Sequence, residues 1–109
     1  MLTIIRTKAH EQLLQQAAED FSGYIKVVVD CQRKILAAGG QRHFEGEELL
    51  LKDGSRQEDL WGGGLDLETG EIDFDSMINI RSKQNNPSRE VLSTEIRKVM
   101  VEIISTLLR

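Results

Sequence analysis

The sequence predicts an α+β fold, a two-layer sandwich whose mainly antiparallel sheet of two hairpins plus an edge strand is covered by N- and C-terminal helices. Apolar residues at three- and four-residue steps mark an amphipathic helix near each end of the chain. Between these helices, strand-like runs come in pairs separated by three-residue turns, which predicts the two hairpins. The 109 residues suffice for one core, so we expect a single domain over residues 1–109.

The amino-terminal part predicts an edge strand, a helix and the first hairpin. Leu2 to Ile5 is a short apolar run suited to an edge strand, and Thr7 stands where a helix cap belongs. An apolar stripe at helical spacing then runs from His10 to Phe21. Residues 24–30 (YIKVVVD) and 34–38 (KILAA) follow as two strand-like runs, and their spacing suits a tight antiparallel hairpin.

The middle of the chain is open to two interpretations before the second hairpin begins. Residues 47–54 (EELLLKDG) read either as a short helix closed by Gly54 or as a strand entering a turn, and we favour the helix. Residues 60–67 (LWGGGLDL) and 71–81 (EIDFDSMINIR) predict the second hairpin. The three glycines at 62–64 lower strand propensity and predict a bulge or a close backbone approach.

The later strand of that hairpin is expected to have one buried and one wet face. The buried face would hold Ile72, Phe74, Ser76, Ile78 and Ile80, and the wet face Asp73, Asp75, Met77, Asn79 and Arg81. Ser93 is then a reasonable cap for a final helix whose apolar stripe runs from Ile96 to Leu107. We expect this apolar stripe to pack against the sheet.

Composition and charge narrow the class of protein. Cys31 is the only cysteine, which excludes an internal disulfide and suits a reducing cytosol. No apolar run approaches the length of a membrane span, so we expect a cytoplasmic protein. The net charge of −4 hides an acidic middle, with −9 over residues 44–75 between segments of +2 and +3. This distribution argues against nucleic-acid binding and fits self-complementary contact in a homodimer, although a solvated acidic face explains it too.

Three segments together resemble a known family: VVVDCQRKILAAGG, LLLKDGSRQEDLWG and EIDFDSMINIR. They are similar to a family of small prokaryotic, largely cyanobacterial proteins that is catalogued only as a domain of unknown function. The likeness runs from about Tyr24 to the final helix, and it departs at Ser82, where a proline is expected. The resemblance implies a shared fold and a shared site, and it supplies no catalytic roles.

The polar loop before the last helix is the best candidate for a ligand site. Its cations and amides, followed by a helix amino terminus, are ingredients that hold a phosphate or carboxylate. The predicted ligand-binding residues are Asn79, Arg81, Lys83, Asn86, Ser88 and Arg89. No glycine-rich phosphate cradle accompanies them, and a solvated connection is the competing interpretation.

Other chemistry-bearing residues support an alternative function. His43, Glu45 and Glu47 alternate, which on a strand would gather metal ligands, and Asp73 with Asp75 would form a carboxylate pair. A helix beginning near residue 46 scatters the first three. Trp61 either fills the core or exposes a patch for self-association, and Cys31 lies beside Arg33 and Lys34 without a nearby histidine in the sequence.

The leading interpretation is therefore a small cytoplasmic, non-enzymatic binding module, expected to be a homodimer, that holds a small anionic ligand near residues 79–89. We expect no cofactor, no resident metal and no catalytic residues for it. The alternative is a small metal-assisted hydrolase that uses His43 and the acidic residues Glu45, Glu47, Asp73 and Asp75. Convergence of at least three of these five side chains on one cleft would favour chemistry, and dispersal would favour the module.

Overall fold

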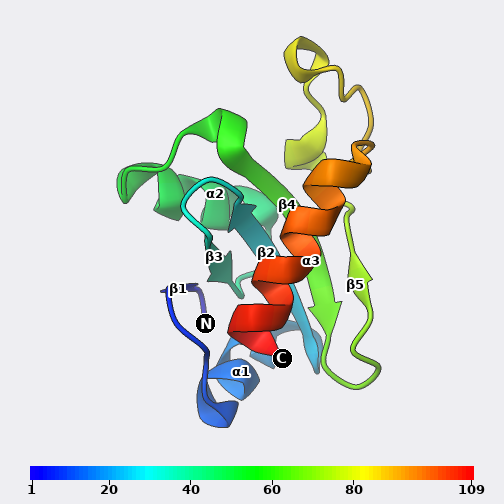
Figure 1. The fold of residues 1–109 in the computed structure, drawn as a ribbon. Helices are drawn as coiled ribbons and strands as arrows, with labels where there is room; N and C mark the ends of the chain where they lie inside the picture. The colour runs from blue at the N-terminus through cyan, green and yellow to red at the C-terminus, as the bar shows by residue number, and fades with distance from the viewer.

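The computed structural model describes all residues from Met1 to Arg109 and contains one five-stranded antiparallel sheet with three α-helices (Figure 1). The sheet order is β1-β3-β2-β4-β5. The strands are β1 (Thr3–Ile5), β2 (Tyr24–Asp30), β3 (Ile35–Ala38), β4 (Leu60–Asp66) and β5 (Ile72–Asp73), and the helices are α1 (Glu11–Ala17), α2 (His43–Lys52) and α3 (Thr94–Leu108). The predicted α+β class with a mainly antiparallel sheet is confirmed.

The central strand β2 organises the sheet because both of its long neighbours pair with it. β3 returns beside it through a turn at residues 31–34, with Val27 opposite Ala38. On the other side β4 pairs along its whole length, with Val27 opposite Gly63. The β-branched run of β2 is buried from Val27 to Val29, as expected for a strand covered on both faces.

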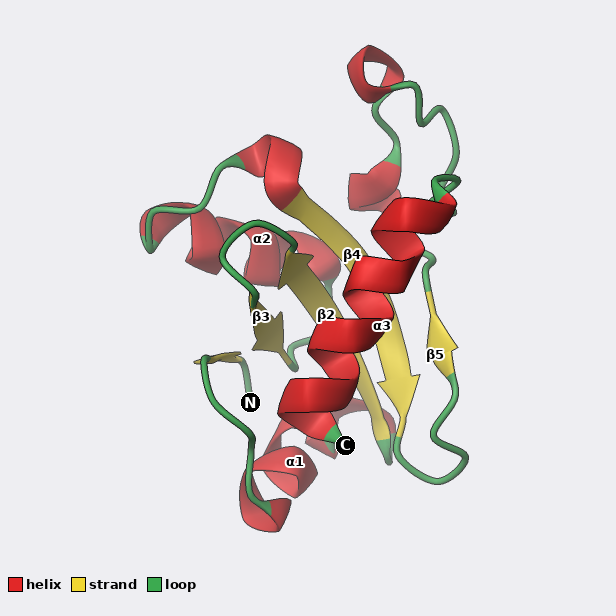
Figure 2. Cartoon of the chain, viewed as in Figure 1, coloured by secondary structure: helices red, strands yellow, loops and turns green.

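The two faces of the sheet are covered by different helices, which gives a third layer that the sequence did not predict. Ile25, Val27 and Val29 point into the larger core, together with residues of α1 and α3. Val28 points the opposite way, into a smaller core with Leu50 of α2. Figure 2 shows α3 crossing β2 and β4 on one side while α2 lies on the other.

The helix α2 settles the open choice for residues 47–54 in favour of a helix. It ends before Gly54, whose φ of +105° is a left-handed cap conformation. Gly46 allows the close approach to the sheet, since a β-carbon there would lie 3.1 Å from Val28 and 3.2 Å from Ala37. The third layer therefore depends on a small residue facing the strands.

The two terminal helices cover the larger core, but their caps differ in how well they were predicted. Ser93 accepts a hydrogen bond from the Ile96 N–H at 3.2 Å and caps α3, as expected. The predicted cap at Thr7 is wrong, because Nδ1 of His10 accepts the corresponding bond from the Leu13 N–H at 3.2 Å. The first helix is also shorter than its stripe, since Glu19–Phe21 form a 3₁₀ turn and Phe21 is exposed.

The long second strand of the second hairpin is the main correction. β5 contains only Ile72 and Asp73, and the backbone then turns through 3₁₀ segments at Met77–Asn79 and Ser82–Gln84. The exposure of Met77, at 63%, still agrees with the predicted alternation, but the next positions do not: Asn79, expected on the wet face, is fully buried, and Ile80, expected on the buried face, is 46% exposed. In Figure 1 this segment stands out from the sheet between β5 and α3.

Candidate functional site

The side chain of Asn79 forms hydrogen bonds to β4 in place of those that the predicted longer strand would have formed with its backbone. Its side-chain oxygen accepts a hydrogen bond from the Gly62 N–H at 2.8 Å, and its amide nitrogen lies 2.9 Å from the Gly62 carbonyl. The same nitrogen lies within 3.1 Å of the Phe74 and Arg89 carbonyls. A buried amide with these backbone partners has no donor left for a ligand. Asn79 is therefore a scaffold residue that fixes the loop to β4.

Asn86 performs the same task at the outer end of the loop. It donates to the carbonyls of Asn79, Ser88 and Glu90 at 2.8 to 3.0 Å and accepts from the Leu92 N–H at 2.9 Å. Its side chain is buried. The Ser88 hydroxyl accepts the Glu90 N–H at 3.0 Å. Three of the six predicted ligand-binding residues thus hold the loop together, which a sequence pattern cannot distinguish from ligand-facing amides.

Arg81 has a half-buried guanidinium group that is already positioned. It lies over the Trp61 ring, with 4.4 Å from its Cζ atom to the ring centroid. It donates to the carbonyl oxygens of Ile78 at 2.9 Å and Gln57 at 2.8 Å, and also to that of Leu60. Burial lowers the pKa of Arg81 from its usual high value. Trp61 is buried, so its exposure as an oligomer patch is excluded.

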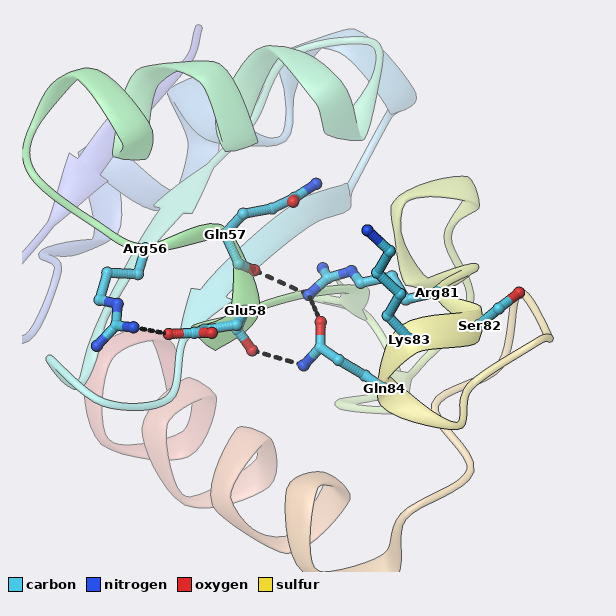
Figure 3. A pocket seen from close by; sticks show the side chains of 7 residues that line it. All are labelled: Arg56, Gln57, Glu58, Arg81, Ser82, Lys83 and Gln84. Atoms are coloured by element: carbon cyan, nitrogen blue, oxygen red, sulfur yellow. Dashed lines mark hydrogen bonds and ion pairs between the residues drawn. The ribbon is translucent and has the colours of Figure 1, made fainter.

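A hollow of about 620 Å³ opens beside Arg81, and we call it the basic hollow (Figure 3). No hydrophobic residue lines it. Its lining residues are Arg56, Gln57, Glu58, Arg81, Ser82, Lys83 and Gln84. Glu58, the only acid, forms an ion pair with Arg56. Figure 3 shows the side chains of Lys83 and Gln57 extending beside the Arg81 guanidinium without a partner among the residues drawn.

A second cavity of about 600 Å³ lies on the α2 side of the sheet, and we call it the glycine cleft. Its lining residues are Tyr24, Lys26, Arg42, His43, Phe44, Asp73, Asp75, Ser76, Met77, Ile78, Arg89 and Glu90. Arg89, predicted to bind the ligand with Arg81, lies here instead and pairs with Asp75 at 3.0 Å. The structure therefore divides the predicted loop site between two hollows.

Two glycines of β4 lie directly beneath side chains that line this cleft. A β-carbon on Gly64 would lie 1.8 Å from the Tyr24 hydroxyl oxygen. A β-carbon on Gly62 would lie 2.6 Å from the β-carbon of Ser76 and 3.1 Å from the His43 ring. The predicted close approach at 62–64 is confirmed: neighbouring side chains lie directly over Gly62 and Gly64, whereas the backbone of β5 lies close to Gly63.

Tyr24 and Asp73 form a short hydrogen bond across β4. The Tyr24 hydroxyl donates to Oδ2 of Asp73 at 2.6 Å, and Oδ1 of Asp73 accepts the Asp75 N–H at 3.2 Å. Burial, and then the hydrogen bond to Asp73, raise the pKa of Tyr24 well above its ordinary value. The phenol therefore stays protonated and acts as a hydrogen-bond donor at neutral pH.

His43 contributes an imidazole in which a hydrogen bond to the backbone fixes the position of one ring nitrogen. Its Nε2 atom lies 2.7 Å from the Gly63 carbonyl oxygen. A carbonyl oxygen only accepts, so Nε2 carries the proton and Nδ1 holds the lone pair in the neutral ring. Burial lowers the pKa of His43, and this effect exceeds the opposing one of the Gly63 carbonyl. No hydrogen-bond partner of the protein occupies Nδ1.

The metal-site hypothesis is only partly matched by the geometry. His43, Asp73 and Asp75 line the glycine cleft, but Glu45 and Glu47 do not. Oε1 of Glu45 instead accepts the Gln41 and Arg42 N–H groups at 3.1 and 3.0 Å at the start of α2. No three His, Cys, Asp or Glu side chains are placed to hold one metal ion. The cleft therefore gathers acid–base groups without a recognisable metal-ligand set.

Cys31 lies in the β2–β3 turn and is partly buried. Burial, followed by the charges of Asp30 and Asp59, raises the pKa of the thiol to about 12. The charge of Arg81 opposes this rise in the pKa but does not outweigh it. The thiol is therefore a poor nucleophile at neutral pH.

The fold and the hollows define an α+β protein with an open antiparallel sheet and two cavities beside one loop, one without hydrophobic lining and one with a mixed lining. The chain belongs to the family described as "Protein of unknown function (DUF5674)", whose model matches residues 3–107, and the expected resemblance to a family of unknown function is confirmed. No curated protein and no solved structure matches the chain significantly. None of its helices combines the length and the apolar character that crossing a membrane requires.

Proposed function

We propose that the protein is a small binding module that holds an anionic ligand in the basic hollow. One observation carries the proposal: three cationic side chains surround a hollow whose single acid is already paired with Arg56. The absence of apolar lining favours a charged group over a hydrophobic one. A phosphate or carboxylate group would restore the balance of charge.

Two donors are available at the centre of the hollow. Lys83 is exposed and its ammonium group has three N–H donors and no partner. The Arg81 guanidinium has five N–H groups, and its bonds to Ile78, Gln57, Gln84 and Leu60 use four of them. The remaining N–H is held in place by the others, so a ligand would meet a pre-positioned cation beside a flexible one.

The test replaces Lys83, because its loss leaves the loop's internal hydrogen bonds intact. Inorganic phosphate and citrate are titrated in turn while amide resonances of residues 56–58 and 81–84 are followed by NMR. We expect Lys83→Ala to weaken binding by about tenfold, the value of one charge-assisted hydrogen bond. Lys98→Ala, at an exposed position on α3, is the matched control and should bind as the unsubstituted protein does. Equal weakening in both variants would mean nonspecific charge attraction and refute the proposal.

Metal-assisted hydrolysis, the alternative, has weaker support. His43, Asp73 and Asp75 line one cleft, so the criterion of three converging side chains is met. The support is weaker because Glu45 and Glu47 lie elsewhere and no group of side chains is placed to hold the metal ion that the reaction needs. A cytoplasmic location and a homodimer also stay predictions. Light scattering over a concentration series tests the dimer, and a constant monomer mass would contradict it.

A further inference from the structure

The glycine cleft is a part of the sheet surface that the fold leaves uncovered. Lys26 and Tyr24 lie on the same face of β2 as Val28, two and four residues away from it. α2 covers Val28 but does not extend over the other two. An open sheet face of this kind is usually either apolar and masked, or polar and simply wet. Here the face is polar but not simply exposed to water, because the side chains of Tyr24, His43 and Ser76 occupy the space that a β-carbon at Gly62 or Gly64 would need.

The charged groups of the cleft are not all neutralised by each other. Arg89 is paired with Asp75, and Glu90 with Arg97. Lys26 and Arg42 form no ion pair, and each lies near an aromatic ring, of Phe21 at 5.0 Å and of Phe44 at 6.0 Å. Two uncommitted cations therefore face a cavity whose acids are mostly occupied. They favour a ligand that carries its own negative charge.

The hydrogen-bond acceptors in the cleft favour a ligand that also carries hydrogen-bond donors. Nδ1 of His43 has a free lone pair, because the Gly63 carbonyl holds the proton on Nε2. The two oxygens of Asp73 each accept one bond from the protein, and each has a further lone pair. Hydroxyl groups are the natural partners of such acceptors. Phe44 and Met77, both largely exposed, add an apolar rim.

We propose that the glycine cleft is a second ligand site, separate from the basic hollow, that binds a small phosphorylated sugar or polyol. The phosphate lies between Lys26 and Arg42. The hydroxyl groups donate to Nδ1 of His43 and to the Asp73 carboxylate. The cavity of about 600 Å³ is in the range of small-ligand pockets, so it accommodates such a molecule.

The experiment uses ribose 5-phosphate as the probe, with inorganic phosphate and ribose as comparison ligands, and follows the imidazole nitrogens of His43 by ¹⁵N NMR. Before addition, the spectrum should show the neutral ring with the proton on Nε2. Ribose 5-phosphate should shift Nδ1, and inorganic phosphate at the same concentration should not. Binding of ribose 5-phosphate no tighter than that of ribose would overturn the role of the cations. An unmoved Nδ1 resonance at saturation would overturn the role of His43.

Two variants separate this site from the basic hollow. Lys26→Met keeps the aliphatic stem and should weaken ribose 5-phosphate by about ten- to a hundredfold, as expected for a lost charge-assisted contact. The phosphate response of residues 81–84 should be unchanged in Lys26→Met. Lys83→Ala should give the converse result, with ribose 5-phosphate binding at His43 retained. Loss of both responses in either variant would overturn the assignment of two separate sites.

Discussion

Replacing Gly64 with alanine tests whether the glycines of β4 are required by the side chains that lie over them. The new β-carbon would lie 1.8 Å from the Tyr24 hydroxyl oxygen and 2.7 Å from a ring carbon, so the ring must move. Moving it breaks the 2.6 Å hydrogen bond to Asp73. Overpacking costs about 1–3 kcal/mol, and a hydrogen bond to a charged partner contributes about 1.5–3 kcal/mol. Alanine recovers only about 0.5–1 kcal/mol over glycine in a strand.

The net expectation is a loss of about 1.5–5.5 kcal/mol in the free energy of unfolding, a large part of the ~5–15 kcal/mol of an ordinary domain. Urea denaturation followed by tryptophan fluorescence measures it, because Trp61 is the single buried reporter. A double-mutant cycle assigns the cause. Tyr24→Ala should relieve the Gly64→Ala variant, so that the double variant is less destabilised than the sum by about 2 kcal/mol or more.

Gly63→Ala is the matched control for this cycle. Its β-carbon would lie 2.2 Å from the Asp73 carbonyl oxygen, which belongs to the backbone of the neighbouring strand. Tyr24→Ala should therefore give no relief at position 63. A Gly64→Ala variant that loses less than about 1 kcal/mol, or one whose loss adds to that of Tyr24→Ala, would refute the steric reasoning.

Two further substitutions test the loop and the cleft. Asn79→Ala leaves the Gly62 backbone and two other carbonyls without their buried partner. It should lower the free energy of unfolding, measured by urea denaturation, by about 3–5 kcal/mol, whereas Lys83→Ala should change it by no more than about 0.5 kcal/mol. Similar losses in the two variants would contradict a scaffold role for Asn79. For His43, the pKa is depressed in the folded protein, so the unfolded chain binds more protons in mildly acid solution. Stability from this group is full above the unfolded pKa of about 6.5 and falls as the pH drops toward the folded pKa, with a slope of at most about 1.4 kcal/mol per pH unit. His43→Gln should flatten that slope, and an unchanged slope would assign it to other groups.

The elements predicted correctly were those whose local pattern and long-range packing agree. The stripe of α3, the β2–β3 hairpin and the cap at Ser93 each follow from the period or spacing of a few residues. The segment after Asp73 failed because alternation continued in the sequence while the backbone turned away. Ser76 accepts the Ile78 N–H at 3.2 Å and starts a 3₁₀ turn there, which competes with the strand.

The candidate sites were predictable in part for a related reason. Of the residues predicted to bind a ligand, Arg81 and Lys83 line one hollow, whereas Arg89 lines the other cavity. The glycine cleft was missed as a unit because Tyr24 and Lys26 come from β2, His43 from α2 and Asp73 from β5, three segments far apart in the sequence. The one signal for it was the run of three glycines, which indicates close approach without saying which side chain approaches. Only the register of β2 with β4 places Tyr24 over Gly64.

The position of Asn79 links the two hollows mechanically. Residues 73–78 form one wall of the glycine cleft, and residues 81–84 form one wall of the basic hollow. Asn79 lies between these stretches and ties both to Gly62 through a pair of hydrogen bonds of 2.8 and 2.9 Å. A shift of the loop along β4 would therefore change both cavities at once, whereas substitutions at Lys26 or Lys83 act on one cavity alone. The buried Asn79 amide therefore holds in place the loop that forms one wall of each cavity.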